Sequence, residues 1–431
     1  MICAIRFSEL LREGKEKNRA VASRAFAVGG AILLASLIWY LKTTSFLFFW
    51  YDPLRMLYSI LASGFLFSRL LISTYYRAPE DKGYLPSLSV VIAAMNEQDS
   101  IARTVEHCFA SRYPADLMEV IVVDDGSTDK TWEALQAIQP KYPKMKLIKF
   151  PKNQGKRHGM AAGAKAATGE ILVYVDSDSF VEPEGIYRIV QPFFYKSIGA
   201  VSGHTLVDLE KDNPISKMES VRYYISHRIL KASESVFGAV TCCPGAFSAY
   251  RRETVMRVLN DWLNQRFLGV QATFGDDRSL TNYILRTHQV IYHDEARART
   301  KVPDRWMKYF KQQLRWKKSW ARETLVASRL MYKEHPIAAI SYYTGVVLTL
   351  LSPFLMIHSL IYMPLVFATN PLQYLGGLVL AYLFLGLVCL FLTGTPYWLY
   401  GLSFAFLYIS VLSWQNYYAM LTVNKTAWGT R

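Results

Sequence analysis

Two acidic residues in the middle of the chain have the types and spacing for metal chemistry. Asp176 and Asp178 stand two residues apart, directly after the apolar run 171–175. Carboxylates at this extended spacing share one face and can bind one divalent cation or its waters. Mg²⁺ and Mn²⁺ favour a few carboxylates combined with substrate phosphates. The pair therefore predicts a Mg²⁺ or Mn²⁺ site beside a phosphorylated ligand.

A second acidic pair and a basic pair are candidates for nucleotide contacts. Asp124 and Asp125 follow an apolar run and precede Gly126, which permits a tight turn. One of these carboxylates could accept hydrogen bonds from a base or a ribose, although a turn with acidic surface residues is the alternative. Lys156 and Arg157 could contact a diphosphate, but a solvated helix start would show the same residues.

Two further clusters supply an acid–base pair and a binding face. Asp276 and Asp277 stand beside Arg278, and adjacent carboxylates near an arginine can keep different pKa values, as a general base requires. The segment QQLRW places a glutamine, an arginine and a tryptophan on one helix face, at positions 312, 315 and 316. On that face the arginine could bind phosphate and the indole could stack on a sugar ring.

The elements that must position these residues alternate in type between about 85 and 300. Strands are predicted from apolar, valine- and isoleucine-rich runs at 88–94, 120–123, 146–150, 171–175 and 200–203. Helices are predicted between them at 100–111, 131–138 and 159–167. This order indicates a mostly parallel sheet covered on both faces, which binds ligands beyond the carboxyl ends of its strands. Both acidic pairs described first follow such strands.

The ends of the chain predict a membrane protein. Residues 337–424 contain no Asp, Glu, Lys or Arg, and about 20 apolar residues are enough for one span. Four spans are our preferred interpretation of this range, with two spans plus interfacial segments as the alternative. Residues 25–41 and 54–76 predict two more spans. Basic residues crowd before the first span, which predicts a cytoplasmic N-terminus, and an even number of crossings would return the C-terminus to the cytoplasm.

The formal net charge of +15 has an explanation other than nucleic-acid binding. Basic residues concentrate next to the predicted spans, and residues 306–330 interleave them with aromatic residues, as expected for a helix at the membrane interface. We therefore expect contact with membrane lipid and none with nucleic acid. The five cysteines form no CxxC pair or zinc-binding spacing.

Taken in chain order, the clusters resemble the processive members of glycosyltransferase family 2. This group includes hyaluronan, cellulose, chitin and rhizobial chitooligosaccharide synthases. Its signatures VDDGS, DSD, GDDR and QxxRW stand at residues 123–127, 176–178, 275–278 and 312–316. Finer matches favour the hyaluronan and chitooligosaccharide branch, namely NQGKRH at 153–158, CCPGAFSAYRR at 242–252, FLG with GDDRSLTNY within 267–283, and WGTR at 428–431.

The resemblance implies a role for each candidate residue. Donor binding would involve Asp124, Asp125, Lys156, Arg157, Asp176, Gln312 and Arg315. Asp178, assisted by Asp176, would bind the Mg²⁺ or Mn²⁺ ion. Asp277, with Asp276 beside it, would act as the catalytic base. Acceptor contacts would come from Cys243, Gly245, Arg278 and Trp316, and a gating segment from Trp428 and Arg431.

The resemblance also implies an organisation and a product. We expect a cytoplasmic GT-A-like α/β glycosyltransferase domain inserted in an α-helical transmembrane domain of a cell-membrane protein. The expected parts are a basic N-terminus (1–24), two spans (25–76), the catalytic domain (85–300), interface helices (301–336), C-terminal spans (337–424) and a gating segment (425–431). The expected reaction is polymerisation of UDP-sugars, to hyaluronan first and to a chitin-type or other β-linked product second. Pro244 precedes Gly245, whereas these families usually place proline after that glycine, so the product stays open.

Overall fold

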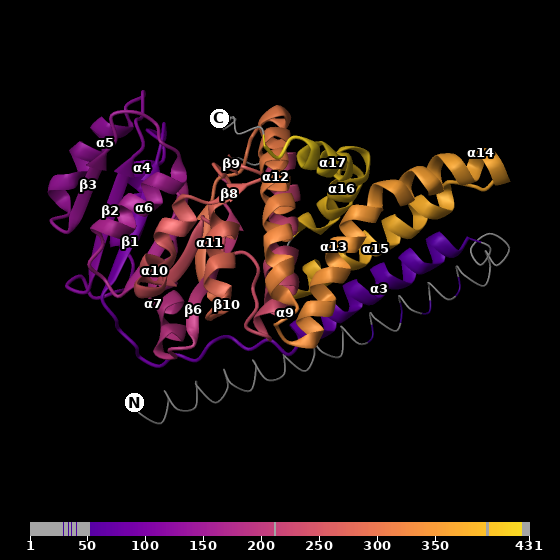
Figure 1. The fold of residues 1–431 in the computed structure, drawn as a ribbon, viewed down its shortest axis with the longest axis horizontal. Helices are drawn as coiled ribbons and strands as arrows, with labels where there is room; N and C mark the ends of the chain where they lie inside the picture. Colours follow the sequence, from indigo (N-terminus) through magenta and orange to yellow (C-terminus); the bar gives the residue numbers. More distant parts are fainter. Residues whose placement is uncertain are drawn as a thin grey trace.

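The computed structural model describes residues 52–210, 213–393 and 396–424, together with positions 29, 33, 36 and 40. An α/β unit lies beside a group of long helices (Figure 1). The predicted N-terminal and gating segments at 1–24 and 425–431 lie outside the described residues, as does most of the first predicted span at 25–41. Trp428 and Arg431 therefore have no described position.

The α/β unit is built on one mixed sheet of eight strands. Their order across the sheet is β3-β2-β1-β4-β7-β6-β10-β5. The strands are β1 (Leu88–Ala94), β2 (Met118–Asp124), β3 (Met145–Lys149), β4 (Ile171–Val175), β5 (Ser179–Val181), β6 (Ile198–Val207), β7 (Phe247–Arg251) and β10 (Gln289–Thr300). The first four are mutually parallel, whereas β7 runs antiparallel to both β4 and β6. A small hairpin of β8 (Arg266–Phe267) and β9 (Val270–Gln271) lies apart.

Helices cover both faces of the sheet because its strands are apolar on both sides. Alternate side chains of β1 enter opposite cores: Val90 and Ile92 pack in one and Val91 in the other. The first core is closed by α4 (Ile101–Phe109), α5 (Thr131–Ile138) and α7 (Gly185–Val190). The second is closed by α6 (Lys156–Ala166), α9 (Ala232–Ser235), α10 (Arg252–Leu263) and α11 (Asp276–Leu285). This two-faced α/β architecture confirms the predicted fold class.

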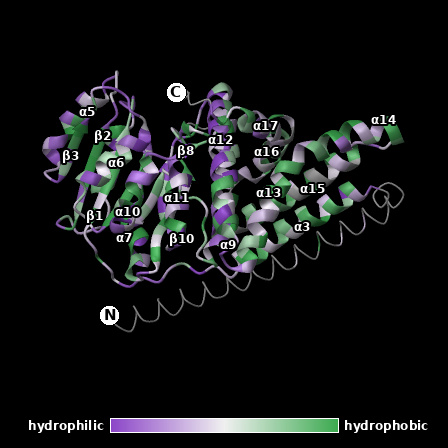
Figure 2. Ribbon diagram, in the orientation of Figure 1, coloured by the Kyte–Doolittle hydropathy of each residue, from purple (hydrophilic) through white to green (hydrophobic). Residues whose placement is uncertain are grey.

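The remaining helices include the long apolar ones. They are α3 (Pro53–Ser73), α8 (Pro214–Ile225), α12 (Trp306–Met331), α13 (Pro336–Ile357), α14 (Met363–Phe367), α15 (Leu372–Thr393), α16 (Tyr400–Leu407) and α17 (Ser413–Leu421). In the described residues, three helical stretches are long and apolar enough to cross a membrane: Pro53–Ser73, Pro336–Phe367 and Tyr397–Leu421. Figure 2 shows their hydrophobic colouring, which α15 shares. These helices make the chain a membrane protein.

The described part of residues 337–424 differs from the preferred pattern of four separate spans. It holds three apolar helical stretches, of which two meet the length and hydropathy requirements for a span. The last stretch, comprising α16 and α17, packs against α8 and α12. The number of crossings and the cytoplasmic placement of both termini therefore stay predictions.

Helix α12 separates the sheet from the apolar helices. It packs against α11 on the side of the sheet and against α13 and α17 on the other side (Figure 1). Its predicted role as a basic, aromatic helix at the membrane interface stays a prediction. The QQLRW segment lies in its first half and faces the α/β unit.

Candidate active site

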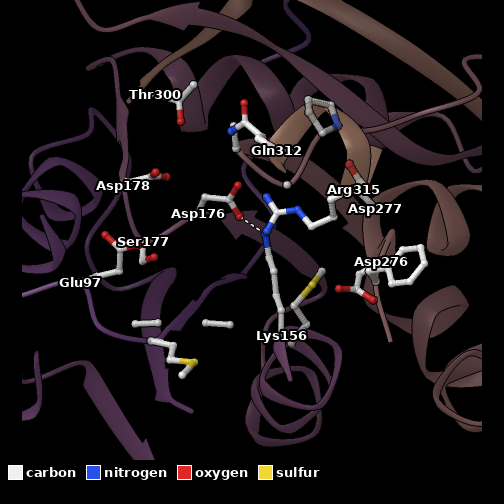
Figure 3. Close-up of a pocket in the computed structure, with 18 of the residues that line it drawn as sticks. Glu97, Lys156, Asp176, Ser177, Asp178, Asp276, Asp277, Thr300, Gln312 and Arg315 are labelled. Carbon is white, nitrogen blue, oxygen red and sulfur yellow. Dashed lines mark hydrogen bonds and ion pairs between the residues drawn. The ribbon is translucent and has the colours of Figure 1, made fainter. Parts of the chain in front are cut away.

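A cavity of about 320 Å³ opens at the carboxyl ends of the parallel strands, where α6, α11 and α12 meet. Strands β1, β2 and β4 all end at this edge of the sheet, which brings residues from distant motifs together. Ten of the predicted site residues line the cavity: Asp125, Lys156, Asp176, Asp178, Gly245, Asp276, Asp277, Gln312, Arg315 and Trp316. Figure 3 shows Lys156, Asp176 and Arg315 converging in its middle.

An ion pair at the centre of the cavity joins two of the motifs. Lys156, the first residue of α6, contacts the Asp176 carboxylate that follows β4. Although burial opposes the charge, the carboxylates of Asp176, Asp277 and Asp276 raise the pKa of Lys156. Gly245 packs directly on this pair, since a β-carbon there would lie 2.8 Å from Lys156 Nζ and 2.9 Å from Asp176 Oδ1. Glycine is the residue that fits this contact without displacing the pair.

Asp125 stabilises the loop that precedes α6 through hydrogen bonds to its backbone. Its two carboxylate oxygens accept hydrogen bonds from the backbone amides of Gln154 at 2.7 Å and Gly155 at 2.8 Å. Each oxygen keeps further acceptor capacity toward the cavity. Asp124, in contrast, is fully buried and does not line the cavity, and its Oδ1 accepts from the Ser127 amide at 3.2 Å. Nucleotide contact by either residue remains a prediction, with only Asp125 exposed to the cavity.

The acidic pair predicted to hold a metal faces the cavity from the turn between β4 and β5. Asp178 is buried, and this burial together with the neighbouring Asp176 carboxylate raises the pKa of Asp178 to about 7. A nearby cation would favour its ionised form. Among the described residues no group of three or more His, Cys, Asp or Glu side chains is close enough to enclose a metal. Two carboxylates that leave one side of the site open fit a Mg²⁺ or Mn²⁺ ion whose remaining ligands would come from substrate phosphates.

Asp277 is the carboxylate of α11 that remains available at the cavity wall. Gly275 begins the helix in a left-handed conformation with φ of 74°. A β-carbon there would lie 2.0 Å from Ser319 Oγ, so the glycine lets α11 approach α12 closely. Asp277 lies in the first turn, where the helix dipole stabilises a negative charge. Its oxygens accept from the Arg278 amide at 2.8 Å and from Cys242 Sγ at 3.8 Å.

Asp276 lines the cavity with the rest of the cluster but is engaged by Arg157. Arg157 Nε and Asp276 Oδ1 are 2.7 Å apart, and the two side chains are 3% and 5% exposed. The guanidinium also donates to the Trp262 carbonyl at 2.9 Å and to Gln265 Oε1 at 3.1 Å. Arg157 does not line the cavity. The pair thus joins α6, α10 and α11 behind the site, and the predicted diphosphate contact of Arg157 has no support from this geometry.

Replacing Asp276 with Ala is expected to destabilise the protein. It leaves a buried guanidinium unpaired, which costs about 3–5 kcal/mol and lowers the melting temperature by about 10 °C. Thermal unfolding of the detergent-purified protein measures this shift. The double variant Arg157→Met/Asp276→Ala removes the stranded charge and should melt higher than Asp276→Ala alone. A single variant that melts with the wild type would contradict the structural role.

The QQLRW face of α12 supplies the remaining cavity wall. Gln312, Arg315 and Trp316 all face the cavity, as their spacing predicted. The buried Gln312 Oε1 has no hydrogen-bond partner in the described residues and is available to a ligand. The Trp316 indole is held from behind by the Arg222 guanidinium, 5.2 Å from the ring centre. Arg222 in turn pairs with the fully buried Glu219 of α8, so the indole has a fixed support.

Two predicted acceptor residues lie outside the cavity. Cys243 is fully buried in the core, and its amide donates to Thr281 Oγ1 at 3.0 Å. Its neighbour Cys242 is the cysteine that contacts Asp277. Arg278 lines a second cavity, of about 400 Å³, together with residues of α3, α12 and α13. The sequence could not distinguish which of the two adjacent cysteines contacts Asp277.

Several cavity residues were missed by sequence reasoning. They are Glu97, Ser177, Thr205, Tyr223, Thr300, Lys301 and Ser319. Lys301 follows β10 and donates to Ser100 Oγ at 2.7 Å. The alternating small and charged residues of 296–300 were the available signal for that strand, since Ala296, Ala298 and Thr300 are buried between exposed arginines. Glu97 follows β1 at the same sheet edge as the predicted acidic clusters.

Comparisons with known proteins agree on the kind of domain. Residues 89–259 match the family model described as glycosyl transferase family 2. The chain is 27% identical over 396 residues to a hyaluronan synthase of Streptococcus pyogenes, covering 87% of this chain and 90% of that protein. It is 33% identical over 253 residues to an N-acetylglucosaminyltransferase of Mesorhizobium japonicum, covering 57% of this chain and 58% of the relative.

A solved structure shares the fold. A mannosyltransferase of Pyrobaculum calidifontis, in complex with GDP-Man and Mn²⁺, superposes with a TM-score of 0.56 at 21% sequence identity, covering 87% of this chain and 99% of that one. The likeness supports the GT-A-like fold. The matched family model agrees with the sheet and with the cavity at its carboxyl edge. The chain therefore carries a glycosyltransferase family 2 domain and is a membrane-associated glycosyltransferase.

Proposed function

We propose that the protein is a processive, inverting polysaccharide synthase that uses UDP-sugars and passes its β-linked product across the membrane. Hyaluronan, made from UDP-GlcNAc and UDP-GlcA, is the first product we propose. The observation that carries the proposal is the meeting of all four motifs at one cavity, with a second cavity next to it among the apolar helices. A polymerase needs both a transfer site and an outlet for its product.

The donor side of the cavity suits a nucleoside diphosphate sugar. Asp125 offers carboxylate oxygens to the base or ribose, while Lys156 and Arg315 offer positive charge to the diphosphate. Asp178 and Asp176 would hold a Mg²⁺ or Mn²⁺ ion, which stabilises the charge that develops on the leaving UDP. Glycosyltransfer breaks the bond between the anomeric carbon and the diphosphate oxygen. Fixed cations beside that oxygen lower the barrier because they act where charge appears.

The acceptor side requires a base and a platform. Asp277 would take the proton of the acceptor hydroxyl as its oxygen forms the new bond to the anomeric carbon. Trp316 would stack on the terminal sugar and orient that hydroxyl. One displacement at the anomeric carbon inverts its configuration, so an α-linked donor gives a β-linked product.

The proposed organisation follows from the same arrangement. The catalytic domain would lie in the cytoplasm, where UDP-sugars are available, with both termini on that side of a cell membrane. Helix α12 would rest at the interface through its basic and aromatic residues, in contact with lipid. The second cavity is lined by α3 and α13, two of the candidate spans, which supports a route for the product between them.

Donor requirements distinguish the proposed product from its alternative, a chitin-type polymer. The purified protein is supplied with Mg²⁺ or Mn²⁺ and either UDP-GlcNAc alone or UDP-GlcNAc with UDP-GlcA. Long product that forms only with both donors and is digested by hyaluronidase would establish hyaluronan. Product from UDP-GlcNAc alone that is digested by chitinase would reject hyaluronan and favour the alternative. Absence of polymer from any nucleotide sugar would reject the synthase itself.

Replacing Trp316 with Ala is expected to weaken acceptor use. Loss of the stacked indole should raise the acceptor KM about tenfold while the donor KM changes less than about twofold. Initial rates with an added oligosaccharide acceptor measure both constants. Trp306→Ala, an exposed tryptophan earlier on α12, is the matched control. Equal acceptor KM values for the Trp316 variant and the wild type would count against stacking.

A further inference from the structure

The bridging loop, residues 241–245, connects two functional parts of the first cavity. At one end of the loop Gly245 packs on the ion pair at the centre of the cavity. At the other end Cys242 Sγ lies 3.8 Å from Asp277 Oδ2. The position of this one loop therefore affects both the central ion pair and the proposed base.

Cys242 contacts Asp277 through a thiol that keeps its proton. Burial and, after it, the Asp277 carboxylate raise the pKa of Cys242 to about 11. At neutral pH the sulfur therefore donates to the carboxylate rather than repelling it. The other hydrogen bond to this carboxylate comes from the backbone amide of the next residue, at 2.8 Å. Cys242 is thus the side chain that orients Asp277 by a hydrogen bond in the described part of the chain.

Side chains from separate helical segments hold the backbone of the bridging loop at three consecutive residues. The contacts are Glu234 with the Thr241 amide at 3.0 Å, Lys231 with the Cys242 carbonyl, and Thr281 with the Cys243 amide at 3.0 Å. Glu234 and Thr281 accept hydrogen bonds, whereas Lys231 donates one with a charged group. The direction of the Cys242 peptide, and hence of its side chain, depends on this lysine.

Lys231 is a buried lysine without a carboxylate partner. It is 9% exposed, and its Nζ also donates to Ser202 Oγ at 3.2 Å. Within residues 52–210, 213–393 and 396–424, no carboxylate lies within 4.0 Å of the ammonium. Burial of an unpaired charge destabilises a fold, so an apolar residue would serve stability better. Lys231 also ends a π-helical segment, Ser226–Lys231, a conformation that occurs mostly at functional sites.

We propose that Lys231 is a positioning residue for sugar transfer, which holds the bridging loop so that Cys242 orients Asp277. The inference rests on the proposed synthase function and extends it to a residue that lines neither cavity. Loss of the ammonium would free the Cys242 carbonyl and let the thiol turn away from Asp277. The donor contacts lie on other elements and would remain.

A double-mutant cycle tests the connection between the lysine and the thiol. On the full purified chain with saturating UDP-sugars and Mg²⁺, Lys231→Met should lower kcat about tenfold, and Cys242→Ala should do the same. Because both act through one contact, the double variant should also lose about tenfold rather than about a hundredfold. The donor KM should stay within about twofold of the wild-type value throughout. Multiplied losses in the double variant, or a wild-type kcat in Lys231→Met, would overturn the proposal.

Three further variants separate positioning from general damage. Lys231→Arg keeps a charged donor and should retain kcat within about threefold of the wild type. A loss as large as that of Lys231→Met would contradict the assigned role. Lys231→Leu carries the same expectation as Lys231→Met and replaces it if the methionine variant does not fold. Lys165→Met changes an exposed lysine in the same domain and should behave as the wild type.

Alkylation of Cys242 measures the loop without any sugar transfer. A thiol released from the carboxylate ionises more readily, so iodoacetamide should modify Cys242 about tenfold faster in Lys231→Met than in the wild type. Peptide mass spectrometry identifies the modified cysteine. Equal rates in the two proteins would overturn the proposal. The proposed function fails only if the wild type makes no polymer, and this measurement stays valid in that case.

Discussion

Replacing Asp277 with Asn is expected to reduce sugar transfer about a thousandfold, because a positioned general base contributes about 10²–10⁴-fold to such a step. The amide keeps the size of the side chain but cannot take the acceptor proton. Asp277 lies at the wall of the first cavity opposite Asp178, so the donor contacts should survive (Figure 3). The affinity for UDP should therefore stay within about twofold of the wild-type value.

The experiment combines polymer yield with UDP binding on the same preparation. Asp261→Asn, an exposed aspartate on the neighbouring helix α10, serves as the control and should behave as the wild type. Normal polymer yield from Asp277→Asn would reject this residue as the base. Loss of UDP affinity in parallel with transfer would instead indicate that the residue supports the donor site.

Asp178→Asn is expected to lower transfer about a hundredfold and to remove the dependence of UDP binding on Mg²⁺ or Mn²⁺. The substitution leaves one carboxylate, Asp176, at the predicted metal site, and that residue already pairs with Lys156. Chelation of divalent ions should stop the wild-type reaction, and added Mn²⁺ should restore it. In the variant, restoration should need a much higher ion concentration.

A matched substitution tests whether this effect belongs to the site. Asp116→Asn changes an exposed aspartate in the same domain and should keep the normal response to metal. Wild-type transfer that continues unchanged after chelation would reject a metal-dependent mechanism. A variant with the wild-type metal response would reject Asp178 as a ligand.

The parallel part of the sheet was predictable because its strands are buried on both faces. Such strands read as continuous apolar runs, and the predicted bounds of β1 and β4 agree with the structure. Strands β7 and β10 were missed because they mix polar and charged residues with small ones and lie in the antiparallel or irregular part of the sheet. The fold class could thus be read from the sequence, but the full strand order could not.

Convergence of the motifs was predictable, whereas the orientation of adjacent residues was not. Neighbours on a helix point about 100° apart, so Lys156 faces the cavity while Arg157 enters the core. Asp277 and Asp276 both line the cavity, but only Asp276 pairs with Arg157. Sequence adjacency reveals that a pair lies near the site, but only packing against other helices decides which member is free to act.

The close packing of Gly245 has a consequence for how related sequences diverge. Any other residue there brings a β-carbon to within 3 Å of both members of the Lys156–Asp176 pair. Both obstructing atoms are the ends of side chains, so a larger residue would fit only if the lysine and the aspartate turned away from their present contact. Position 245 is therefore coupled to positions 156 and 176 through space, and we expect substitutions at the three positions to occur together when homologues are compared.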